Sequence, residues 1–251
     1  MKRTVIITGG TSGFGLEAIK VFLREEKSKV HLISISRSES KIAKAKKELG
    51  NNSKLVEFLQ ADVSSVEEIN SITKQILKKY GKVDVLVNNA GTIIPGGIEI
   101  LECCDWDWVI KNNLSSYYYM TKAFIPLLKK SKNAAIVNIS SISAKLGGSS
   151  IAYSVSKAGV DMITKTTAKE LAKYKIRVNA ISPGMANTGF HISNNVYDEQ
   201  GYNQMLDTVK KDYPLGIGQS SDIAEMIYYL SSEKAKWMTG SNVLIDGGKS
   251  L

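Results

Sequence analysis

Short apolar runs, often β-branched, alternate with amphipathic stretches along the 251 residues of the chain. Runs such as Val5–Ile7 and Ala134–Val137 are apolar at consecutive positions, which is typical of strands buried on both faces. Between them, apolar residues recur at helical spacing, as in Ile69, Ile72 and Ile76. The predicted strands are residues 4–8, 30–35, 55–59, 83–87, 134–139, 177–181 and 242–245. The predicted helices cover about residues 16–23, 41–49, 66–80, 106–130, 153–173 and 221–230.

This alternation predicts an α/β fold with a parallel sheet covered by helices on both sides. We therefore expect a three-layer, doubly wound Rossmann fold in which residues 1–251 form a single dinucleotide-binding and catalytic domain. One stretch, about residues 184–214, is polar and lacks a strong period. A long irregular segment in a compact domain usually has a function, so residues 185–213 are predicted to cover a substrate.

Composition narrows the class of protein further. Lys and Arg outnumber Asp and Glu by 33 to 24, which gives a net charge of +9, but no basic stripe with interleaved aromatic residues indicates a nucleic-acid partner. The two cysteines, Cys103 and Cys104, are adjacent and form neither a disulfide framework nor a metal motif. No apolar run is long enough for a membrane span or a signal peptide. We expect a cytoplasmic protein with no bound metal and no membrane partner.

A glycine-rich string follows the first predicted strand and precedes the first predicted helix. It reads Thr8-Gly9-Gly10-Thr11-Ser12-Gly13-Phe14-Gly15. Glycines permit a tight turn and a close approach of the backbone to a pyrophosphate, and the helix N-terminus adds free N–H groups and a favourable dipole. Such a string alone is weak evidence, but its position between strand and helix predicts dinucleotide binding.

The end of the second predicted strand indicates which dinucleotide is used. In NAD-binding folds an acid about 20 residues past the glycines binds the ribose hydroxyls. Here those positions hold Ser36 and Arg37 instead. An arginine can form charge-assisted hydrogen bonds with a ribose 2′-phosphate, so NADP(H) is the predicted cofactor.

Candidate proton-transfer residues lie at the start of the long helix after residue 150. Tyr153 and Lys157 are four residues apart and therefore share one helix face. A neighbouring ammonium favours a phenolate and lowers the pKa of the tyrosine, which makes it usable as a general acid or base. This spacing is also common on surface helices, so its meaning depends on the hydroxyls upstream, at Ser140 and Ser141, where a strand ends.

Taken together, these motifs resemble the classical short-chain dehydrogenase/reductase family along nearly the whole chain. The matching elements are the glycine string, Asp62-Val63, Asn88-Asn89-Ala90-Gly91, Asn113-Leu114, the region of Ser141, Tyr153 to Lys157, Pro183-Gly184 with Thr188, and Asp246-Gly247-Gly248.

The resemblance implies roles for individual residues. Tyr153 would exchange a proton with the substrate, Lys157 would bind the nicotinamide ribose and lower the Tyr153 pKa, Ser141 would orient the carbonyl, and Asn113 would shape the long helix and hold a water linking Lys157 to solvent. The implied cofactor-binding residues are Gly9, Thr11, Ser12, Gly13, Phe14, Gly15, Ser36, Arg37, Asp62, Val63, Asn89, Ala90, Gly91, Tyr153, Lys157, Pro183, Gly184, Ala186 and Thr188.

The identity of the serine is left open by the sequence. Ser140 stands thirteen residues before Tyr153, a spacing frequent in the family, whereas Ser141 matches the motif at the end of the strand. Side chains alternate along a strand, so only one of the two can face the substrate, and we choose Ser141.

The resemblance also implies a homotetramer that reduces a carbonyl compound or oxidises an alcohol. One specific option is a 3-oxoacyl-(acyl-carrier-protein) reductase, with the acidic carrier protein as a partner of the basic surface. The two arginines that often dock this carrier correspond to Lys132 and Tyr174, so one basic residue is retained and one is lost. The alternative from another class is a catalytically silent NADPH-binding sensor or scaffold. The complete set of Ser141, Tyr153 and Lys157 argues against it.

Overall fold

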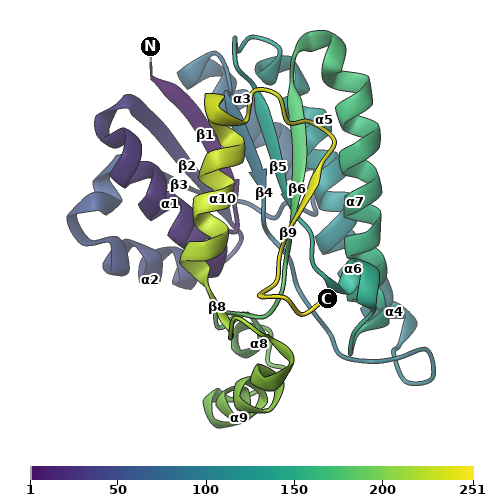
Figure 1. The fold of residues 1–251 in the computed structure, drawn as a ribbon. Coiled ribbons are helices and arrows are strands. Elements are labelled where there is room, and N and C mark those ends of the chain that lie inside the picture. Colours follow the sequence, from purple (N-terminus) through teal and green to yellow (C-terminus); the bar gives the residue numbers. More distant parts are fainter. Residues whose placement is uncertain (1) are drawn as a thin grey trace.

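The computed structural model describes residues 2–251, and its centre is a sheet of seven parallel strands. The strand order β3-β2-β1-β4-β5-β6-β9 reverses direction between β1 and β4, as expected for a doubly wound fold (Figure 1). Its strands are β1 (Arg3–Thr8), β2 (Val30–Ser36), β3 (Val56–Gln60), β4 (Val85–Asn88), β5 (Ala135–Ile139), β6 (Arg177–Pro183) and β9 (Asn242–Ile245). The predicted fold class and all seven strands are confirmed.

Helices cover both faces of the sheet because successive strand residues point to opposite sides. Val5 and Ile7 of β1 belong to one apolar core, whereas Ile6 belongs to the other. The first core packs under α1 (Gly13–Glu26), α2 (Glu39–Leu49) and α10 (Ser220–Ser231). The second packs under α3 (Val66–Tyr80), α5 (Ser116–Leu128) and α7 (Ile151–Leu171).

Short polar side chains determine where several of these helices begin. The hydroxyls of Ser38, Ser65 and Ser150 accept hydrogen bonds from backbone N–H groups in the first turns of α2, α3 and α7. The cap at Ser150 matters for function, because its acceptor contact is with the backbone N–H of Tyr153. It starts α7 at a position that directs Tyr153 and Lys157 along one face.

The helix predicted for residues 106–130 begins earlier and is not regular. It consists of α4 (Cys103–Ile110), a π-helical segment η3 (Lys111–Ser115) and α5. One wider turn rotates the side chains that follow it, and such segments are frequent at functional sites. Periodicity could not reveal it, since the apolar spacing on both sides is still helical.

The segment predicted to be irregular, about residues 184–214, contains regular structure. It holds β7 (Ala186–Asn187), α8 (Phe190–Ser193), α9 (Glu199–Val209) and the 3-10 turn η5 (Lys210–Asp212). β7 pairs with β8 (Gly218–Gln219) outside the main sheet. The helix α9 was missed because its sequence is mostly polar and exposed; Asp198 caps its N-terminus and Tyr202 is its one buried residue. The remaining short elements are α6 (Ser143–Leu146) and the 3-10 turns η1 (Lys27–Lys29), η2 (Gly50–Leu55), η4 (Ala172–Tyr174) and η6 (Glu233–Ala235).

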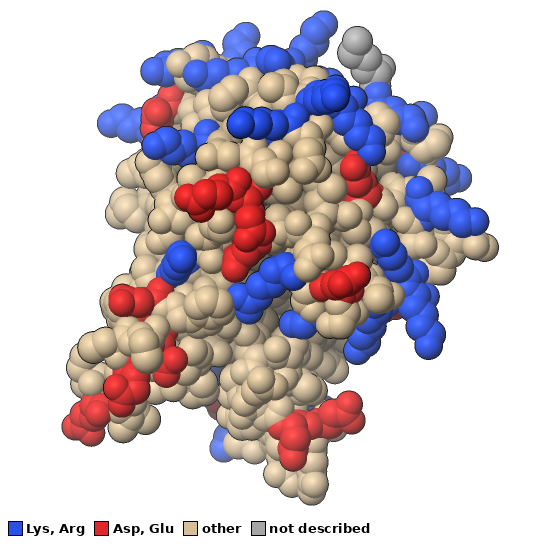
Figure 2. All heavy atoms as spheres, turned by 180° about the vertical axis from the view of Figure 1, so that it is seen from behind, with Lys and Arg blue, Asp and Glu red and all other residues tan. Residues whose placement is uncertain are grey.

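Across residues 2–251, no helix combines the length and the apolar character that crossing a bilayer requires. Charged side chains are unevenly distributed. Figure 2 shows Lys and Arg gathered at the end of the molecule that carries the N-terminus and the amino ends of the strands, while acidic side chains are more frequent toward the opposite end.

A chain of buried amides connects β4 and β5 to the helices behind them. Asn88 Nδ2 donates to Asn138 Oδ1 at 2.9 Å and to Thr121 of α5 at 3.2 Å, and Asn138 Nδ2 donates to Thr164 of α7 at 2.9 Å. Both asparagines are at most 1% exposed. A buried polar group that loses its partner costs roughly 1–3 kcal/mol, so this network holds the two strands and α7 in one arrangement.

Asn138→Ala is expected to lower the free energy of unfolding by about 2 kcal/mol, because it leaves buried donor and acceptor groups on Asn88 and Thr164 with fewer partners. Denaturant unfolding measures the change. The matched control is Asn133→Ala, the same substitution at a half-buried bend before β5, for which we expect a change within about 0.5 kcal/mol. Equal stability of the two variants would contradict the role given to the amide chain.

Candidate active site

A pocket of about 590 Å³ opens at the carboxyl ends of the strands, around the point where the strand order reverses. Ligands of open α/β sheets bind at this position. The predicted residues that line it are Gly9, Thr11, Ser12, Gly13, Phe14, Ser36, Arg37, Asp62, Val63, Asn89, Ala90, Gly91, Ser141, Tyr153, Lys157, Pro183, Gly184, Ala186 and Thr188. Two predicted residues, Gly15 and Asn113, lie behind the wall and support it.

The glycine turn has the geometry that its sequence requires. Gly9 and Gly13 have φ values of +65° and +51°, a region that disfavours other residues. A Cβ on Gly15 would lie 2.5 Å from the carbonyl oxygen of Gly9, so this position supports the turn from below. Asn89, after β4, fastens the turn by donating from Nδ2 to the carbonyls of Thr8 at 2.9 Å and Gly9 at 3.2 Å.

One end of the pocket carries two cationic side chains. The Arg37 guanidinium lies 5.0 Å from the ring centroid of Trp108, and its Nη1 is 3.4 Å from Asn112 Oδ1. Lys41, in the first turn of α2, also lines this end, where partial burial and the nearby charge of Arg37 lower its pKa. Two cations held near each other provide a site for an anion. Lys41 was not among the residues predicted from the sequence: it stands only four positions after Arg37, but its place at the pocket follows only from the packed chain.

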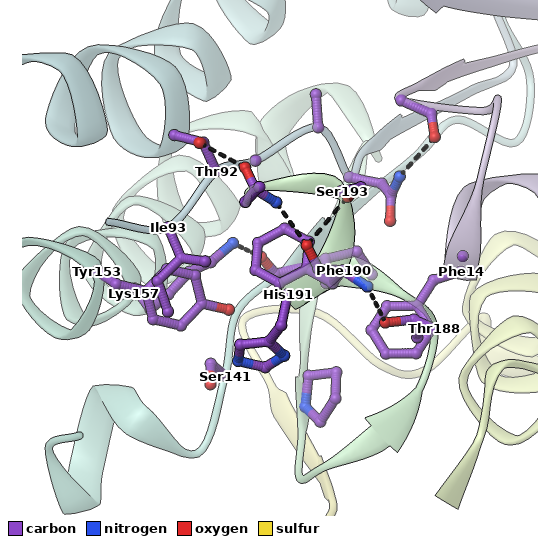
Figure 3. Close-up of a pocket in the computed structure, with 18 of the residues that line it drawn as sticks. Phe14, Thr92, Ile93, Ser141, Tyr153, Lys157, Thr188, Phe190, His191 and Ser193 are labelled. Atoms are coloured by element: carbon purple, nitrogen blue, oxygen red, sulfur yellow. Dashed lines mark hydrogen bonds between the residues drawn. The ribbon is translucent and has the colours of Figure 1, made fainter. Parts of the chain in front are cut away.

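Tyr153, Lys157 and Ser141 meet at the other end. Figure 3 shows Tyr153 and Lys157 side by side on α7 and Ser141 beneath them, all on one wall of the pocket. Burial raises the pKa of Tyr153 to about 12, although the hydrogen bond with the Ser141 hydroxyl acts to lower this pKa. The phenol is therefore protonated and able to donate.

Lys157 is almost completely buried. The residue is only 3% exposed, and its Nζ donates a hydrogen bond to the carbonyl oxygen of Ile139, the last residue of β5, at 2.7 Å. Burial lowers the pKa of Lys157 to about 7, and the carboxylate of Asp161 one turn further along α7 opposes this shift. The sequence predicted a lowered Tyr153 pKa. The pKa is raised instead, because burial disfavours the phenolate more than the neighbouring groups favour it.

The two candidate serines differ in the hydrogen bonds that their hydroxyls make with the backbone. Ser140 Oγ donates to the backbone carbonyl of Lys157 at 3.2 Å and is committed to holding α7 against β5. Ser141 Oγ accepts from the N–H of Ser143 at 3.1 Å, which leaves its hydrogen free to point at the pocket and Tyr153. Both serines border the pocket, but the Ser140 hydroxyl is used by the backbone of Lys157, so this geometry favours Ser141.

Asn113 lies in the π-helical segment and is fully buried. Its amide makes paired hydrogen bonds with the backbone of Thr92, accepting from N–H at 2.8 Å and donating to C=O at 2.9 Å, and it also donates to Ser156 at 3.1 Å. Asn113 therefore joins the turn after β4 to α7. In the structure this side chain acts on the protein backbone rather than lining the pocket.

The segment after β6 closes over the pocket through specific contacts. Thr92 Oγ1 donates to Asn194 Oδ1 at 2.7 Å, and Asn194 Nδ2 donates to the carbonyl of Phe190 at 2.8 Å (Figure 3). The ring of Phe190 lies 6.2 Å from that of Tyr153, centroid to centroid, and His191 also lines the pocket. The sequence singled out this segment but not the contact between Thr92 and Asn194, which lie 102 positions apart and carry no motif.

No group of three or more His, Cys, Asp or Glu side chains within residues 2–251 is arranged to hold a metal ion. The residues that are present instead fit a dinucleotide. Gly9 and Gly13 line the pocket without side chains, which lets a pyrophosphate approach the backbone of the turn, and a pair of cations lies beside Ser36 at the ribose end.

Comparison with known proteins agrees with this geometry. The 3-oxoacyl-(acyl-carrier-protein) reductase of Chlamydia pneumoniae is 32% identical over 249 residues, which make up 98% of this chain and 96% of the relative. The reductase of the same name from Thermotoga maritima is 33% identical over 248 residues, or 98% and 97% of the two chains.

Solved structures agree equally well. The ligand-free aldohexose dehydrogenase of Thermoplasma acidophilum superposes with a TM-score of 0.86 at 28% identity, covering 99% of this chain and 94% of that chain. The structure of ElxO with NADP bound gives a TM-score of 0.87 at 32% identity, covering 100% and 99%. Residues 3–199 also match the family model described as short chain dehydrogenase. The resemblance found in the motifs is confirmed: the chain belongs to the short-chain dehydrogenase family.

Proposed function

We propose that this protein is an NADP(H)-dependent oxidoreductase that interconverts a ketone or aldehyde and the corresponding alcohol. The observation that carries the proposal is that Ser141, Tyr153 and Lys157 share one pocket with the glycine turn and the cations at Arg37 and Lys41. A similar structure holds NADP, and similar proteins are named as reductases and a dehydrogenase. A sensor would not require a proton donor beside the site of the nicotinamide.

In the proposed reduction, each of the three residues has a separate role. Bound NADPH would supply a hydride to the carbonyl carbon. The Ser141 hydroxyl holds the carbonyl oxygen by a hydrogen bond, and Tyr153 gives that oxygen the proton of its phenol. The pKa of about 12 ensures that this proton is present at neutral pH. Lys157 stabilises the phenolate that remains, because its ammonium lies 5.5 Å from the Tyr153 ring centroid.

Residues 185–213 would cover the substrate, with Phe190 and His191 of this segment lining the same pocket as Ser141. For the substrate we retain 3-oxoacyl thioesters on an acyl carrier protein as a specific option, supported by the names of the similar reductases. Tyr174 lies against two lysines, 3.7 Å from Lys129 Nζ and 5.2 Å from Lys173 Nζ measured to the ring centroid. These residues lie just before β5 and β6, at the amino ends of the strands and away from the pocket, so they do not by themselves bring a carrier to Tyr153.

A homotetramer in the cytoplasm is part of the proposal. Large apolar side chains are exposed on the neighbouring helices α4, α5 and α7, at Trp108, Tyr118, Val155 and Met162. Exposed apolar side chains on adjacent helices are typical of subunit interfaces. The free, exposed thiols of Cys103 and Cys104 fit a reducing compartment.

Tyr153→Phe is expected to lower kcat for the best carbonyl substrate by about 10²- to 10⁴-fold, because the proton donor is lost while the ring is retained. Following NADPH absorbance over a panel of ketones measures it. Tyr229→Phe, at an exposed position on α10, is the control and should match the wild type. Wild-type turnover by Tyr153→Phe would overturn the mechanism.

Arg37→Ala and Lys41→Ala are each expected to weaken NADPH binding by about 10- to 100-fold, since each removes a charged donor to the 2′-phosphate. Binding of NADH should change less than about 3-fold. Fluorescence titration measures both, and Lys44→Ala, exposed on the same helix, serves as the control. Equal losses for both dinucleotides would remove the discriminating role from these residues.

The low pKa of Lys157 makes stability depend on pH. Between about pH 7 and 10.5 the unfolded chain keeps a proton that the folded protein has released, so the free energy of unfolding rises with pH. The slope from this one group reaches at most about 1.4 kcal/mol per pH unit. Lys157→Met should remove this rise, whereas Lys165→Met, exposed on the same helix, should keep it. Identical pH profiles for the two variants would show that Lys157 does not titrate in this range.

A further inference from the structure

Tyr117 is a second tyrosine beside the catalytic pair, and the sequence motifs assign it no role. It comes from α5, one turn after Asn113, and is 1% exposed. Its neighbours Tyr118 and Tyr119 are more exposed, so Tyr117 alone of the three points fully inward. The phenol donates to the carbonyl oxygen of Ile139 at 3.2 Å.

The same carbonyl oxygen is the acceptor for Lys157. Nζ of Lys157 donates to it at 2.7 Å, so the two lone pairs of one oxygen receive donors from α5 and from α7. Ile139 is the last residue of β5 and immediately precedes the two candidate serines. The contact therefore connects the end of the strand, the lysine and α5 at a single atom.

The ring of Tyr117 is also in range of the ammonium. Nζ of Lys157 lies 5.3 Å from the Tyr117 ring centroid and 5.5 Å from that of Tyr153. A cation within about 6 Å of an aromatic ring is attracted to it, and the attraction is stronger where water is excluded. The ammonium is thus held near two aromatic rings, of which only Tyr153 has a part in the proposed chemistry.

We propose that Tyr117 is a positioning residue for Lys157: its ring favours the ammonium form beside Tyr153, and its hydroxyl fixes the Ile139 carbonyl to which the ammonium is bound. The catalytic consequence rests on the proposed oxidoreductase function. The contact between the two side chains exists independently of that function.

The electrostatic surroundings explain why such support is needed. Burial lowers the pKa of Lys157 to about 7, so at neutral pH small interactions decide how much of it is charged. The groups that act on it are Tyr153 and Asp161 of α7, Tyr117 of α5 and the Ile139 carbonyl of β5. Asp161 and the aromatic rings favour the ammonium, and burial opposes it.

Tyr117 itself does not take the place of Tyr153 as an acid or base. Complete burial raises the pKa of Tyr117 well above its ordinary value, and the proximity of Tyr153 acts in the same direction. Its proton is also committed to the Ile139 carbonyl. Tyr117 therefore remains a neutral donor while Lys157 titrates.

The test uses Tyr117→Met, which removes the ring but fills much of its volume, and Tyr117→Phe, which keeps the ring and removes the hydroxyl. Phe124→Met is the matched control, because Phe124 is a fully buried aromatic on the same helix that packs in the core on the α5 side of the sheet. The first measurement, without cofactor, is the pH at which the free energy of unfolding begins to rise through Lys157. The second is kcat and KM with NADPH and a ketone.

We expect Tyr117→Met to move the onset of the rise to lower pH by about 0.5–1 unit and to lower kcat at neutral pH by about 3- to 10-fold with little change in KM. Tyr117→Phe should keep the onset of the wild type, and Phe124→Met should reduce stability without moving the onset. An unchanged onset in Tyr117→Met, or an equal shift in Phe124→Met, would overturn the proposal.

Tyr117→Phe keeps the proposal falsifiable if the methionine variant does not fold. A shift of the onset in this variant as large as that expected for Tyr117→Met would assign the whole effect to the hydroxyl and would overturn the role given to the ring. The outcome is also separable from failure of the proposed function. If the wild type shows no turnover that depends on Tyr153, the function is wrong, whereas the onset measured without cofactor still decides whether Tyr117 supports Lys157.

Discussion

Placing the Lys157 ammonium away from water is the constraint on which the rest of the site depends. A buried cation needs hydrogen-bond partners, and here the nearest acceptor is the Ile139 carbonyl at the end of β5. This hydrogen bond therefore fixes both the position of α7 along its axis and its rotation about that axis, relative to the end of β5. The cap at Ser150 fixes where the helix begins, and Ser140 bonds to the backbone of Lys157 itself. Because Tyr153 lies one turn before Lys157 on the same face of α7, fixing the lysine also places Tyr153 at the pocket.

The turn after β4 has a comparable organising role. The Thr92 backbone donates one hydrogen bond to the Asn113 side chain and accepts another from it, and the Thr92 hydroxyl donates to Asn194 of the segment after β6. One residue thus joins the π-helical segment to the segment that closes over the pocket. Because Asn113 also bonds to Ser156 on α7, the covering segment and the catalytic helix are linked through a short series of contacts. Such a series gives the pocket a defined shape before any ligand enters.

The two ends of the pocket place different demands on the sequence. The cofactor end requires glycines and backbone contacts that tolerate little change, since an added Cβ at Gly15 would meet backbone atoms. The end of the pocket proposed to bind substrate is built from α8 and the residues around it, where Phe190 and His191 contact one another and line the pocket. Related folds named as carrier-protein reductases and as an aldohexose dehydrogenase differ in what they are named to act on. Differences in substrate are therefore expected in this covering segment rather than in the sheet.

The sequence by itself determined the sheet, its layers, the glycine turn and the grouping of Ser141, Tyr153 and Lys157 as candidate active-site residues. Each of these depends on local spacing and on the chemistry of single residues. Only the tertiary structure decided the π-helical turn at Lys111–Ser115, the cation pair of Arg37 and Lys41, the contact between Thr92 and Asn194, and the place of Tyr117. It also decided the direction of the two pKa shifts: the pKa of Tyr153 is raised and that of Lys157 is lowered. The physical reason is that burial and contacts between distant residues arise only when the chain is packed, and no pattern of neighbouring residues records them.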